Sequence, residues 1–332
     1  MSRTAPGVII AGTGSYTPSR IVTNEELSTS VETSDEWISS RTGIRERRLA
    51  DDGEVTSTMG AKAGKAAMES ANLKPEQIDL IVVATLSPDM TFPSTASLIQ
   101  HQLGLRMVTS FDISAACSGF IYALEVVSNM MRSGAYHHAL VIGSEKISPI
   151  LDWSDRGTCV LFGDGAGAVV LTKTEDITCG VIDSYTGNDG SRPELLCLPG
   201  GGSAIPTSME SLAHREHYLK MNGREIFKIA VRWMEQSAII MLERHGLSPE
   251  DISLIIPHQA NLRIIDALAR SIKIPREKFF VNLDRYGNTS AASIPIALHE
   301  ARQKDCIQSG DYVLLVAFGA GLTWGSTLIK WH

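Results

Sequence analysis

The sequence predicts a layered α/β fold made of two similar halves, and three observations support this prediction. Amphipathic runs alternate with short β-branched runs along the chain, which favours buried sheets covered by helices. Three blocks of sequence repeat at a single offset of 174 residues. The 332 residues leave room for two units of ordinary domain size. We expect the two halves to span residues 1–175 and 176–332.

The alternation of elements is clearest in the first half. An amphipathic run at 57–73 predicts a helix, and β-branched runs at 78–86 and 108–114 predict strands. The run 117–134 is apolar on nearly all sides, which is typical of a buried helix. A further strand is expected at 138–145.

The internal repeat relates the two halves block by block. The three pairs are Leu73–Ala84 with Leu247–His258, Ala116–Leu124 with Ser290–Leu298, and His138–Glu145 with Tyr312–Gly319. One shared offset is harder to obtain by chance than any single match, so we infer a duplicated unit with a shared core. The alternative is that the ordinary alternation of helices and strands only resembles a repeat. Between the halves, the Gly-, Pro- and Ser-rich stretch 198–211 predicts a surface excursion.

Composition and charge exclude several classes of protein. Hydrophobic residues make up 43% of the chain and the net charge is −7, which disfavours a disordered or nucleic-acid-binding protein. The five cysteines form no CxxC pair, which disfavours a disulfide framework and a zinc site. The apolar part of 1–14 is too short for a signal peptide, and no run approaches the roughly 18 residues of a membrane span. We expect a cytoplasmic protein without metal, nucleic-acid or membrane partners.

Cys117 is the first candidate for chemistry. It lies in "DISAACSGF", where small residues separate a predicted strand from the buried helix. The positive end of a helix dipole would lower the pKa of the thiol and make the sulfur nucleophilic. The alternative is a cysteine that acts as a small buried hydrophobe.

His258 is the second candidate, at the exit of the apolar run "LIIPH". There it can serve as a hydrogen-bond donor or as a base at neutral pH. The helix expected after it has an apolar face made by Leu262, Ile265 and Leu268. The alternative is a residue that only satisfies backbone groups at the start of that helix.

Asn288 is the third candidate, because it lies opposite "ACSG" in the repeat. Gly287 and Asn288 supply turn geometry, and Thr289 or Ser290 is expected to cap a helix that begins near Ala291. The alternative is that Gly-Asn forms only a turn. Together the three candidates are expected at matching strand ends of the two halves, where ligands collect in layered α/β proteins.

Two glycine-rich segments follow predicted strands. "VAFGAGLTWGS" is suited to exposing a backbone N–H beside a reacting carbonyl, and "LFGDGAGAVVL" has the same character earlier in the chain. Neither matches GxGxxG or a P-loop, so no phosphate cradle is predicted. The structural alternative, tight strand packing, is favoured for the second segment.

Five motifs together resemble the β-ketoacyl-acyl-carrier-protein synthase III family of the thiolase superfamily. The resemblance runs nearly end to end, and the motifs occur in the family's order. They are "TSDEWISSRTGIRERR", "DISAACSGF", "DRGTCVLFGDGAGA", "PHQANLRI" and "RYGNTSAASIP". This resemblance implies a duplicated five-layer α/β/α/β/α thiolase fold and a homodimer. It also implies an enzyme that condenses acyl-coenzyme A with malonyl-acyl-carrier protein, losing carbon dioxide, to start fatty-acid synthesis.

The resemblance assigns roles in catalysis to particular residues. Cys117 looks like the nucleophile that becomes the acyl thioester. His258 and Asn288 look like the pair that stabilises the enolate formed on decarboxylation, a task that suits two N–H donors. Phe318 resembles an aromatic residue near the cysteine. Ala320 would supply a backbone N–H to the oxyanion hole with Cys117, at a place where relatives have glycine.

The resemblance also assigns binding residues. Those expected to bind coenzyme A are Trp37, Arg41, Arg156 and, where relatives often have asparagine, Arg224. Those expected to bind the acidic carrier protein are Gln259, Ala260, Asn261, Leu262 and Arg263, extended by Lys228 and Arg270. Phe92 resembles the residue lent across the dimer interface to close the acyl pocket. Acyl-coenzyme A is a substrate here, and no tightly bound cofactor is expected.

Several alternatives stay open at this point. A relative with the same fold could prime a polyketide or quinolone pathway, or transfer an acyl group to oxygen or nitrogen. A biosynthetic thiolase is disfavoured, because Cys306 lies in a polar stretch. From other classes come a Cys/His thioester hydrolase, which lacks an evident orienting carboxylate, and a non-catalytic partner subunit. Acetyl-coenzyme A is the expected primer, although branched or longer chains are not excluded by the sequence.

Overall fold

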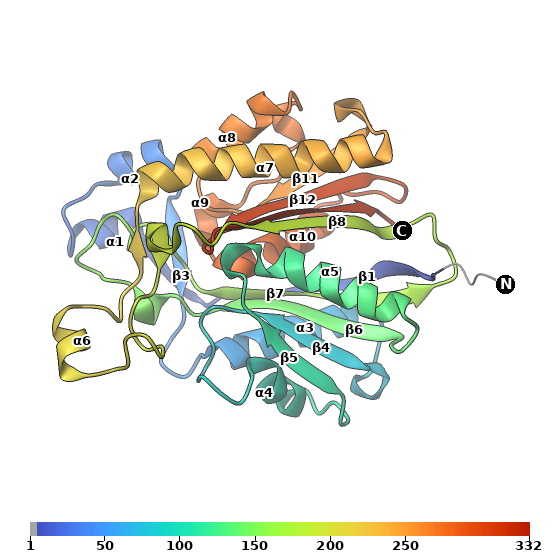
Figure 1. The fold of residues 1–332 in the computed structure, drawn as a ribbon, viewed down its shortest axis with the longest axis horizontal. Coiled ribbons are helices and arrows are strands. Elements are labelled where there is room, and N and C mark those ends of the chain that lie inside the picture. The colour runs from blue at the N-terminus through green and yellow to red at the C-terminus, as the bar shows by residue number, and fades with distance from the viewer. Residues whose placement is uncertain (1–4) are drawn as a thin grey trace.

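Two mixed β-sheets face each other across a central layer of helices (Figure 1). The computed structural model describes residues 5–332, so the first residues of the N-terminal stretch 1–14 lie outside it. The first sheet has the strand order β1-β7-β6-β4-β5, and its strands are β1 (Gly7–Tyr16), β4 (Leu80–Ala84), β5 (Thr109–Ile113), β6 (His138–Glu145) and β7 (Gly165–Thr174). The second has the order β11-β12-β13-β8, and its strands are β8 (Gly180–Asn188), β11 (Ile252–Pro257), β12 (Tyr312–Gly319) and β13 (Thr323–Lys330).

Helices form three layers around the two sheets. The central pair is α5 (Gly119–Arg132) and α10 (Ser293–Gln303). The outer face of the first sheet is covered by α3 (Thr56–Ser70) and α4 (Thr95–Gln102), and that of the second by α7 (Gly223–His245) and α8 (Leu262–Ser271). The order is α/β/α/β/α, as expected (Figure 1).

The strands β4 and β12 are buried on both faces of their sheets, which explains their uninterrupted apolar sequences. In β4, Leu80 and Val82 face the central helices while Ile81 and Val83 face the outer ones. The same alternation occurs in β12, where the apolar side chains are divided between the central and outer clusters. The central cluster contains side chains of both sheets, so the two halves share one core.

The duplication inferred from the repeat is visible in the fold. β6 and β12 lie 174 residues apart. Two 3₁₀ turns, Ala116–Ser118 and Ser290–Ala292, lie at the same offset and lead into α5 and α10. Both turns begin at a residue with positive φ, 45° at Ala116 and 50° at Ser290. The duplicated fold is confirmed, whereas the boundary between residues 175 and 176 stays a prediction.

The remaining elements lie beside the sandwich. They are β2 (Arg20–Thr23), α1 (Asn24–Ser28), α2 (Asp35–Thr42), β3 (Glu46–Leu49), β9 (Leu196–Cys197), α6 (Met209–Ala213), β10 (Lys220–Met221) and α9 (Leu283–Tyr286). The stretch 198–211 is largely exposed and includes the start of α6, which projects away from the sheets in Figure 1. Among the residues that the structure describes, no helix is long and apolar enough to cross a membrane.

Candidate active site

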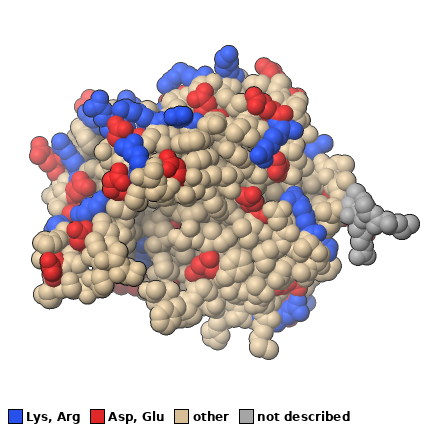
Figure 2. All heavy atoms as spheres, in the orientation of Figure 1, with Lys and Arg blue, Asp and Glu red and all other residues tan. Residues whose placement is uncertain are grey.

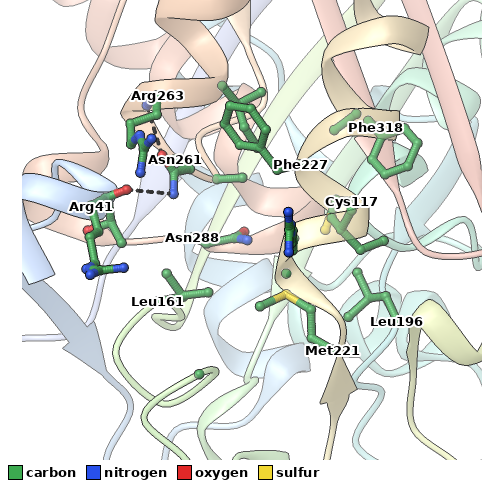
Figure 3. Close-up of a pocket in the computed structure, with 18 of the residues that line it drawn as sticks. Arg41, Cys117, Leu161, Leu196, Met221, Phe227, Asn261, Arg263, Asn288 and Phe318 are labelled. Atoms are coloured by element: carbon green, nitrogen blue, oxygen red, sulfur yellow. Dashed lines mark hydrogen bonds between the residues drawn. The ribbon is translucent and has the colours of Figure 1, made fainter.

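Cys117, His258 and Asn288 line one cavity of about 640 Å³. Each follows a strand end or a turn of one of the two related halves, so the fold brings together side chains that are far apart in sequence. All three are buried, whereas the arginines that line the same cavity are exposed. Figure 3 shows Cys117 beside Phe318 on one side of the cavity, Arg41 and Arg263 on the other, and Asn288 between them.

Cys117 lies in the 3₁₀ turn between β5 and α5. The turn is held against the end of β12, where a side chain in place of Gly319 would come within 2.7 Å of the Cys117 backbone nitrogen. Burial raises the pKa of the Cys117 thiol to about 12. This direction is opposite to the expected lowering of the pKa: α5 itself begins only at Gly119, and burial is the largest cause that acts on the thiol.

His258 directly follows β11, and its backbone N–H donates to Val316 on the neighbouring strand at 2.8 Å. Its Nδ1 lies 2.7 Å from the Ser293 hydroxyl. Burial lowers the pKa of His258 to about 3, so the imidazole is neutral at pH 7. The Ser293 oxygen accepts the Gln259 N–H at 3.4 Å, which leaves the hydroxyl hydrogen free to be donated to Nδ1. In that tautomer the imidazole hydrogen is on Nε2, where it can serve as a donor.

Asn288 is oriented by its own turn. Its side-chain oxygen accepts the backbone N–H of Ser290 at 2.8 Å, which leaves the amide NH₂ as the group available to the cavity. Its backbone is fixed on both sides, because it donates to Leu161 at 2.8 Å and accepts from Gly163 at 3.0 Å. The expected cap by Thr289 or Ser290 is wrong: α10 has Ala292 at its N-cap, without a side-chain hydrogen bond.

The end of β12 forms another wall of the site. Phe318 is buried and lines the cavity with Cys117. Ala320 lines a second cavity of about 380 Å³, which also reaches Cys117. Ala320 is not among the described residues with positive φ, so alanine fits this position without left-handed strain. The positive φ, 137°, occurs at the next residue, Gly321.

The exposed end of the larger cavity is lined by Trp37 and several arginines. The guanidinium carbons of Arg41 and Arg156 lie 4.8 and 5.1 Å from the Trp37 ring centroid, within the range of cation–π contact. Arg156 also donates to the Glu32 carbonyl at 2.9 Å. Arg224 lines the same cavity and is exposed. The four residues expected to bind coenzyme A are thus brought together.

Some of the residues expected to bind the carrier protein line the cavity, and the others do not. Ala260, Asn261 and Arg263 line the cavity, and Asn261 caps α8 while donating to the Arg41 carbonyl at 3.1 Å (Figure 3). Lys228 lines it as well and pairs with Glu225 at 3.0 Å. Leu262, in contrast, is partly buried against Gly43.

The structure contradicts the expectation for Gln259, whereas the role of Arg270 stays a prediction. Gln259 is 1% exposed, and its side chain is hydrogen-bonded to Pro257, Phe280 and Asn282. A residue in this position supports the turn after β11 and is not available to a protein partner. Arg270 is exposed at the far end of α8 and does not line the cavity.

Phe92 is 82% exposed and lines neither of the cavities that reach Cys117. Within one chain it therefore has no role in the site.

Sequence reasoning missed several residues of the site. Phe227 and Met221 line the larger cavity as ordinary apolar residues, which no local motif distinguishes. Ser293 and Glu145 are buried beside the candidate residues. The signal for Glu145 was present, because a carboxylate ends the apolar run "HALVIGSE". No group of three or more metal-ligating side chains occurs within residues 5–332.

Comparison with known proteins shows the family of this chain. Family models described as 3-oxoacyl-[acyl-carrier-protein] synthase III and its C-terminal part match residues 111–190 and 242–331. A β-ketoacyl-[acyl-carrier-protein] synthase III of Caldanaerobacter subterraneus is 53% identical over 97% of both chains. The chain belongs to this synthase III family. The family predicted from the motifs is thereby confirmed, and with it the prediction of an acyltransferase; β-ketoacyl-acyl-carrier-protein synthesis at the start of fatty-acid synthesis is the family's function.

Solved structures of related enzymes superpose closely on this chain. The crystal structure of 3-oxoacyl-[acyl-carrier-protein] synthase III from Aquifex aeolicus has a TM-score of 0.90, with 51% identity over 98% of this chain and 100% of the other. The priming β-ketosynthase of the R1128 polyketide pathway has a TM-score of 0.91, with 34% identity over 100% of this chain and 98% of the other. The predicted thiolase fold is thus confirmed.

Proposed function

We propose that this chain condenses acyl-coenzyme A with malonyl-acyl-carrier protein through an acyl thioester on Cys117. The observation that carries the proposal is one cavity in which a buried thiol meets a neutral imidazole and an oriented amide. The thiol forms the S–C bond to the acyl carbonyl carbon, and coenzyme A leaves as the thiol or thiolate. The backbone N–H groups of Cys117 and Ala320 are the proposed donors to the oxyanion of this step.

His258 and Asn288 are the proposed donors in the second step. When malonyl thioester loses carbon dioxide, negative charge develops on the thioester oxygen. Neutral His258 can donate through Nε2 and Asn288 through its NH₂, and two buried donors stabilise such an enolate. The enolate carbon then attacks the acyl group on Cys117 and releases the 3-oxoacyl product on the carrier protein.

Coenzyme A is the proposed occupant of the exposed end of the cavity. Trp37 and Arg156 offer flat faces that suit stacking with an adenine ring, and the Arg41 guanidinium suits a phosphate. Arg224 lines the same cavity, and we propose that its side chain also contacts coenzyme A there. The coenzyme is used as a substrate and is not retained.

An acidic carrier protein is the proposed partner at the same opening. Figure 2 shows that Lys and Arg side chains gather along the upper left edge of this face, where α2, α7 and α8 lie in Figure 1. The exposed cations that line the opening are Arg41, Arg156, Arg224, Lys228 and Arg263. Such a local patch steers an acidic protein even though the whole chain carries a net charge of −7.

A homodimer is the proposed assembly. β5 is an edge strand of the first sheet, and an uncovered edge favours pairing with another chain. Phe92 and Met107 are 82% and 99% exposed, which is unusual for large apolar side chains unless a partner covers them. Phe92 would then close the acyl pocket of the partner subunit. We also propose a cytoplasmic location, which suits the free thiol that this chemistry needs.

Two other functions are less well supported. A polyketide-priming enzyme shares the fold, but the identity to the R1128 enzyme is 34% against 53% for the Caldanaerobacter relative. A Cys/His hydrolase would need an imidazole that accepts the thiol proton, and burial lowers the pKa of His258 too far for a base at neutral pH.

The test is transfer of label from [1-¹⁴C]acetyl-coenzyme A followed by addition of malonyl-acyl-carrier protein. The wild-type protein should retain label on Cys117 and then pass it to the 3-oxoacyl product. Cys117→Ser should take up no label as a thioester. His258→Ala and Asn288→Ala should still become labelled but should lose condensation by roughly 10²-fold or more. Failure of the wild type to become labelled, or rapid release of free acetate, would overturn the proposal.

A further inference from the structure

Ser293 carries a buried hydroxyl group beside His258 that takes no part in the proposed steps. It is the first residue of α10, and both residues are buried. The Ser293 oxygen lies 2.7 Å from Nδ1 of His258. Ser293 lines neither of the two cavities that reach Cys117, whereas His258 lines the larger one. The serine therefore contacts the imidazole from outside the cavity, and Nε2 is the ring nitrogen left for a ligand.

The internal repeat shows that the fold itself does not need a polar pair at this place. At the offset of 174 residues, His258 corresponds to Ala84 and Ser293 to Gly119. Ala84 ends β4 and Gly119 begins α5, so a strand end meets a helix start in the first half as well. A side chain at Gly119 would come within 3.1 Å of the Ala84 Cβ. Because the first half makes this contact with two of the smallest residues, the histidine and serine of the second half are a feature of the site.

The available donors and acceptors determine the direction of the hydrogen bond between Ser293 and His258. The Ser293 oxygen accepts the backbone N–H of Gln259 at 3.4 Å. Within residues 5–332, Nδ1 of His258 is the one acceptor within hydrogen-bond distance of the Ser293 hydroxyl. If Nδ1 carried the ring hydrogen, the hydroxyl hydrogen would be buried without an acceptor, and buried donors in folded proteins are nearly always paired. The serine therefore donates and Nδ1 accepts.

A hydroxyl group in this position has the opposite effect to a carboxylate. A carboxylate can only accept, so it keeps the ring hydrogen on Nδ1 and leaves Nε2 as an acceptor, which is the arrangement of a histidine that acts as a base. In the part of the chain that the structure describes, no carboxylate is hydrogen-bonded to His258. Ser293 donates, which keeps the ring hydrogen on Nε2 and makes this nitrogen a donor.

We propose that Ser293 is a positioning residue that sets the tautomer and the orientation of His258 for decarboxylation of the malonyl thioester. This role rests on the proposed function, in which Nε2 of His258 donates to the enolate oxygen. Ser293 itself does not touch the substrate. It acts by fixing which ring nitrogen carries the hydrogen and by holding the ring in one place.

The start of α10 then positions both proposed donors. The backbone N–H of Ser290 donates to the side-chain oxygen of Asn288 at 2.8 Å and leaves the amide NH₂ for the cavity. Three residues later, the Ser293 hydroxyl holds His258. One short segment of the second half therefore directs the amide and the imidazole into the same cavity.

The tautomer can be read directly by ¹⁵N NMR of the protein labelled at the histidine ring nitrogens. Protonated and unprotonated nitrogens of a neutral ring resonate at different shifts, and His258→Gln identifies the signals of His258. The wild-type protein should carry the hydrogen on Nε2 at pH 7. Ser293→Ala should show a second population with the hydrogen on Nδ1, because no hydroxyl then holds the Nδ1 lone pair. Ser293→Thr keeps a hydroxyl donor and should keep the wild-type tautomer.

The rates of the two steps give an independent measurement. In the Cys117→Ser background, Ser293→Ala should slow the release of ¹⁴CO₂ from labelled malonyl-coenzyme A by roughly 10- to 10²-fold, because a donor in the wrong tautomer does not stabilise the enolate. With Cys117 intact, labelling by acetyl-coenzyme A should stay within about twofold of the wild type, since the loss is confined to the step that uses the donor. Thermal unfolding and coenzyme A binding check that the variants fold.

Ser326→Ala is the matched control. Ser326 is buried, and its hydroxyl donates to the Ser237 carbonyl at 2.9 Å. It lines neither of the cavities that reach Cys117. Removal of this hydroxyl is the same chemical change as Ser293→Ala, and it should alter neither the rate of decarboxylation nor the tautomer of His258.

The outcomes separate the role of Ser293 from the proposed function. If wild-type Cys117 takes no label and Cys117→Ser releases no carbon dioxide, the proposed function itself fails. If both reactions occur and Ser293→Ala keeps the wild-type rate of decarboxylation or the wild-type tautomer, the role of Ser293 is wrong and the proposed function stands. Equal losses in acylation and decarboxylation would indicate a general structural effect and would also contradict this role.

Discussion

At the residue scale, burial shifts the pKa values of two side chains that line the cavity, those of Cys117 and His258. It removes charge from both Cys117 and His258, since low-dielectric surroundings disfavour a thiolate and an imidazolium alike. For His258 the neutral state suits a donor to an enolate, because no proton needs to be lost before the next cycle.

A consequence for His258 is testable by pH. The pKa of a histidine is ordinarily 6.5, and burial lowers that of His258 to about 3, so the donor stays neutral throughout pH 5–8. Release of ¹⁴CO₂ from labelled malonyl-coenzyme A by the Cys117→Ser variant should therefore show no midpoint near pH 6.5. His258→Ala in the same background is the control. A fall in rate centred near 6.5 would show that the imidazole titrates normally.

The lowered pKa of His258 should also make the free energy of unfolding depend on pH. Below about pH 6.5 the unfolded chain binds a proton at His258 that the folded chain accepts only near pH 3. The burial of this residue therefore costs nothing above pH 6.5 and lowers the free energy of unfolding progressively as the pH falls from 6.5 toward 3.

At the scale of elements, strand ends determine where polar side chains meet. β4, β5 and β6 are parallel, and their carboxyl ends carry Thr85, Cys117 and Glu145 to one edge of the sheet. In the second sheet, β11 and β12 are parallel and deliver His258 and Phe318 in the same way. The carboxyl edge of parallel strands is the usual location of ligand sites in α/β proteins.

The orientation of α8 distinguishes two of its exposed arginines. Arg263 lies in the first turn and lines the cavity, whereas Arg270 lies in the last turn and does not. Arg263→Glu should raise the KM for malonyl-acyl-carrier protein about tenfold, about 1.4 kcal/mol, with a larger effect at low salt. Steady-state kinetics at saturating acetyl-coenzyme A measure this. Arg270→Glu, the matched control, should change KM less than twofold; equal effects would mean that the partner docks along the whole helix.

At the scale of the whole molecule, the two halves share one core. α5 and α10 pack between the sheets, and their apolar side chains join those of both sheets in one cluster. The cavity that Cys117, His258 and Asn288 line is reached from the ends of α5 and α10. Completion of the acyl pocket is proposed to need a second copy of the chain, because Phe92 projects away from its own site.

The dimer proposal predicts complementation between two variants. Phe92→Ala homodimers should show an altered preference among acyl-coenzyme A primers, and Cys117→Ser homodimers should be inactive. A heterodimer of the two has one intact Cys117 whose pocket is closed by Phe92 of the partner subunit, so its primer preference should match the wild type. Sedimentation equilibrium should give twice the 35.9 kDa of one chain. A monomer, or a mixture that keeps the Phe92→Ala preference, contradicts the proposal.

Much of the fold and site could be predicted from sequence because those features are local or repeated. β6 was predicted with its observed bounds, and the 174-residue offset relates it to β12. Cys117, His258 and Asn288 follow strands or turns that are recognisable in sequence. Errors arose where burial or distant contacts decided the outcome, as for the side chain of Gln259, the pKa of Cys117 and the cap of α10.

The sequence by itself determined the duplicated α/β fold, its family and the three residues at the centre of the cavity, because periodicity, repeats and motifs are properties of the chain. Only the tertiary structure decided which of their neighbours are charged, exposed or hydrogen-bonded. Ser290 and Glu145 are 145 residues apart in sequence, yet the packing of two related turns and a strand end places their oxygens 3.0 Å apart. Electrostatics in a buried site depends on such distances, and no local pattern encodes them.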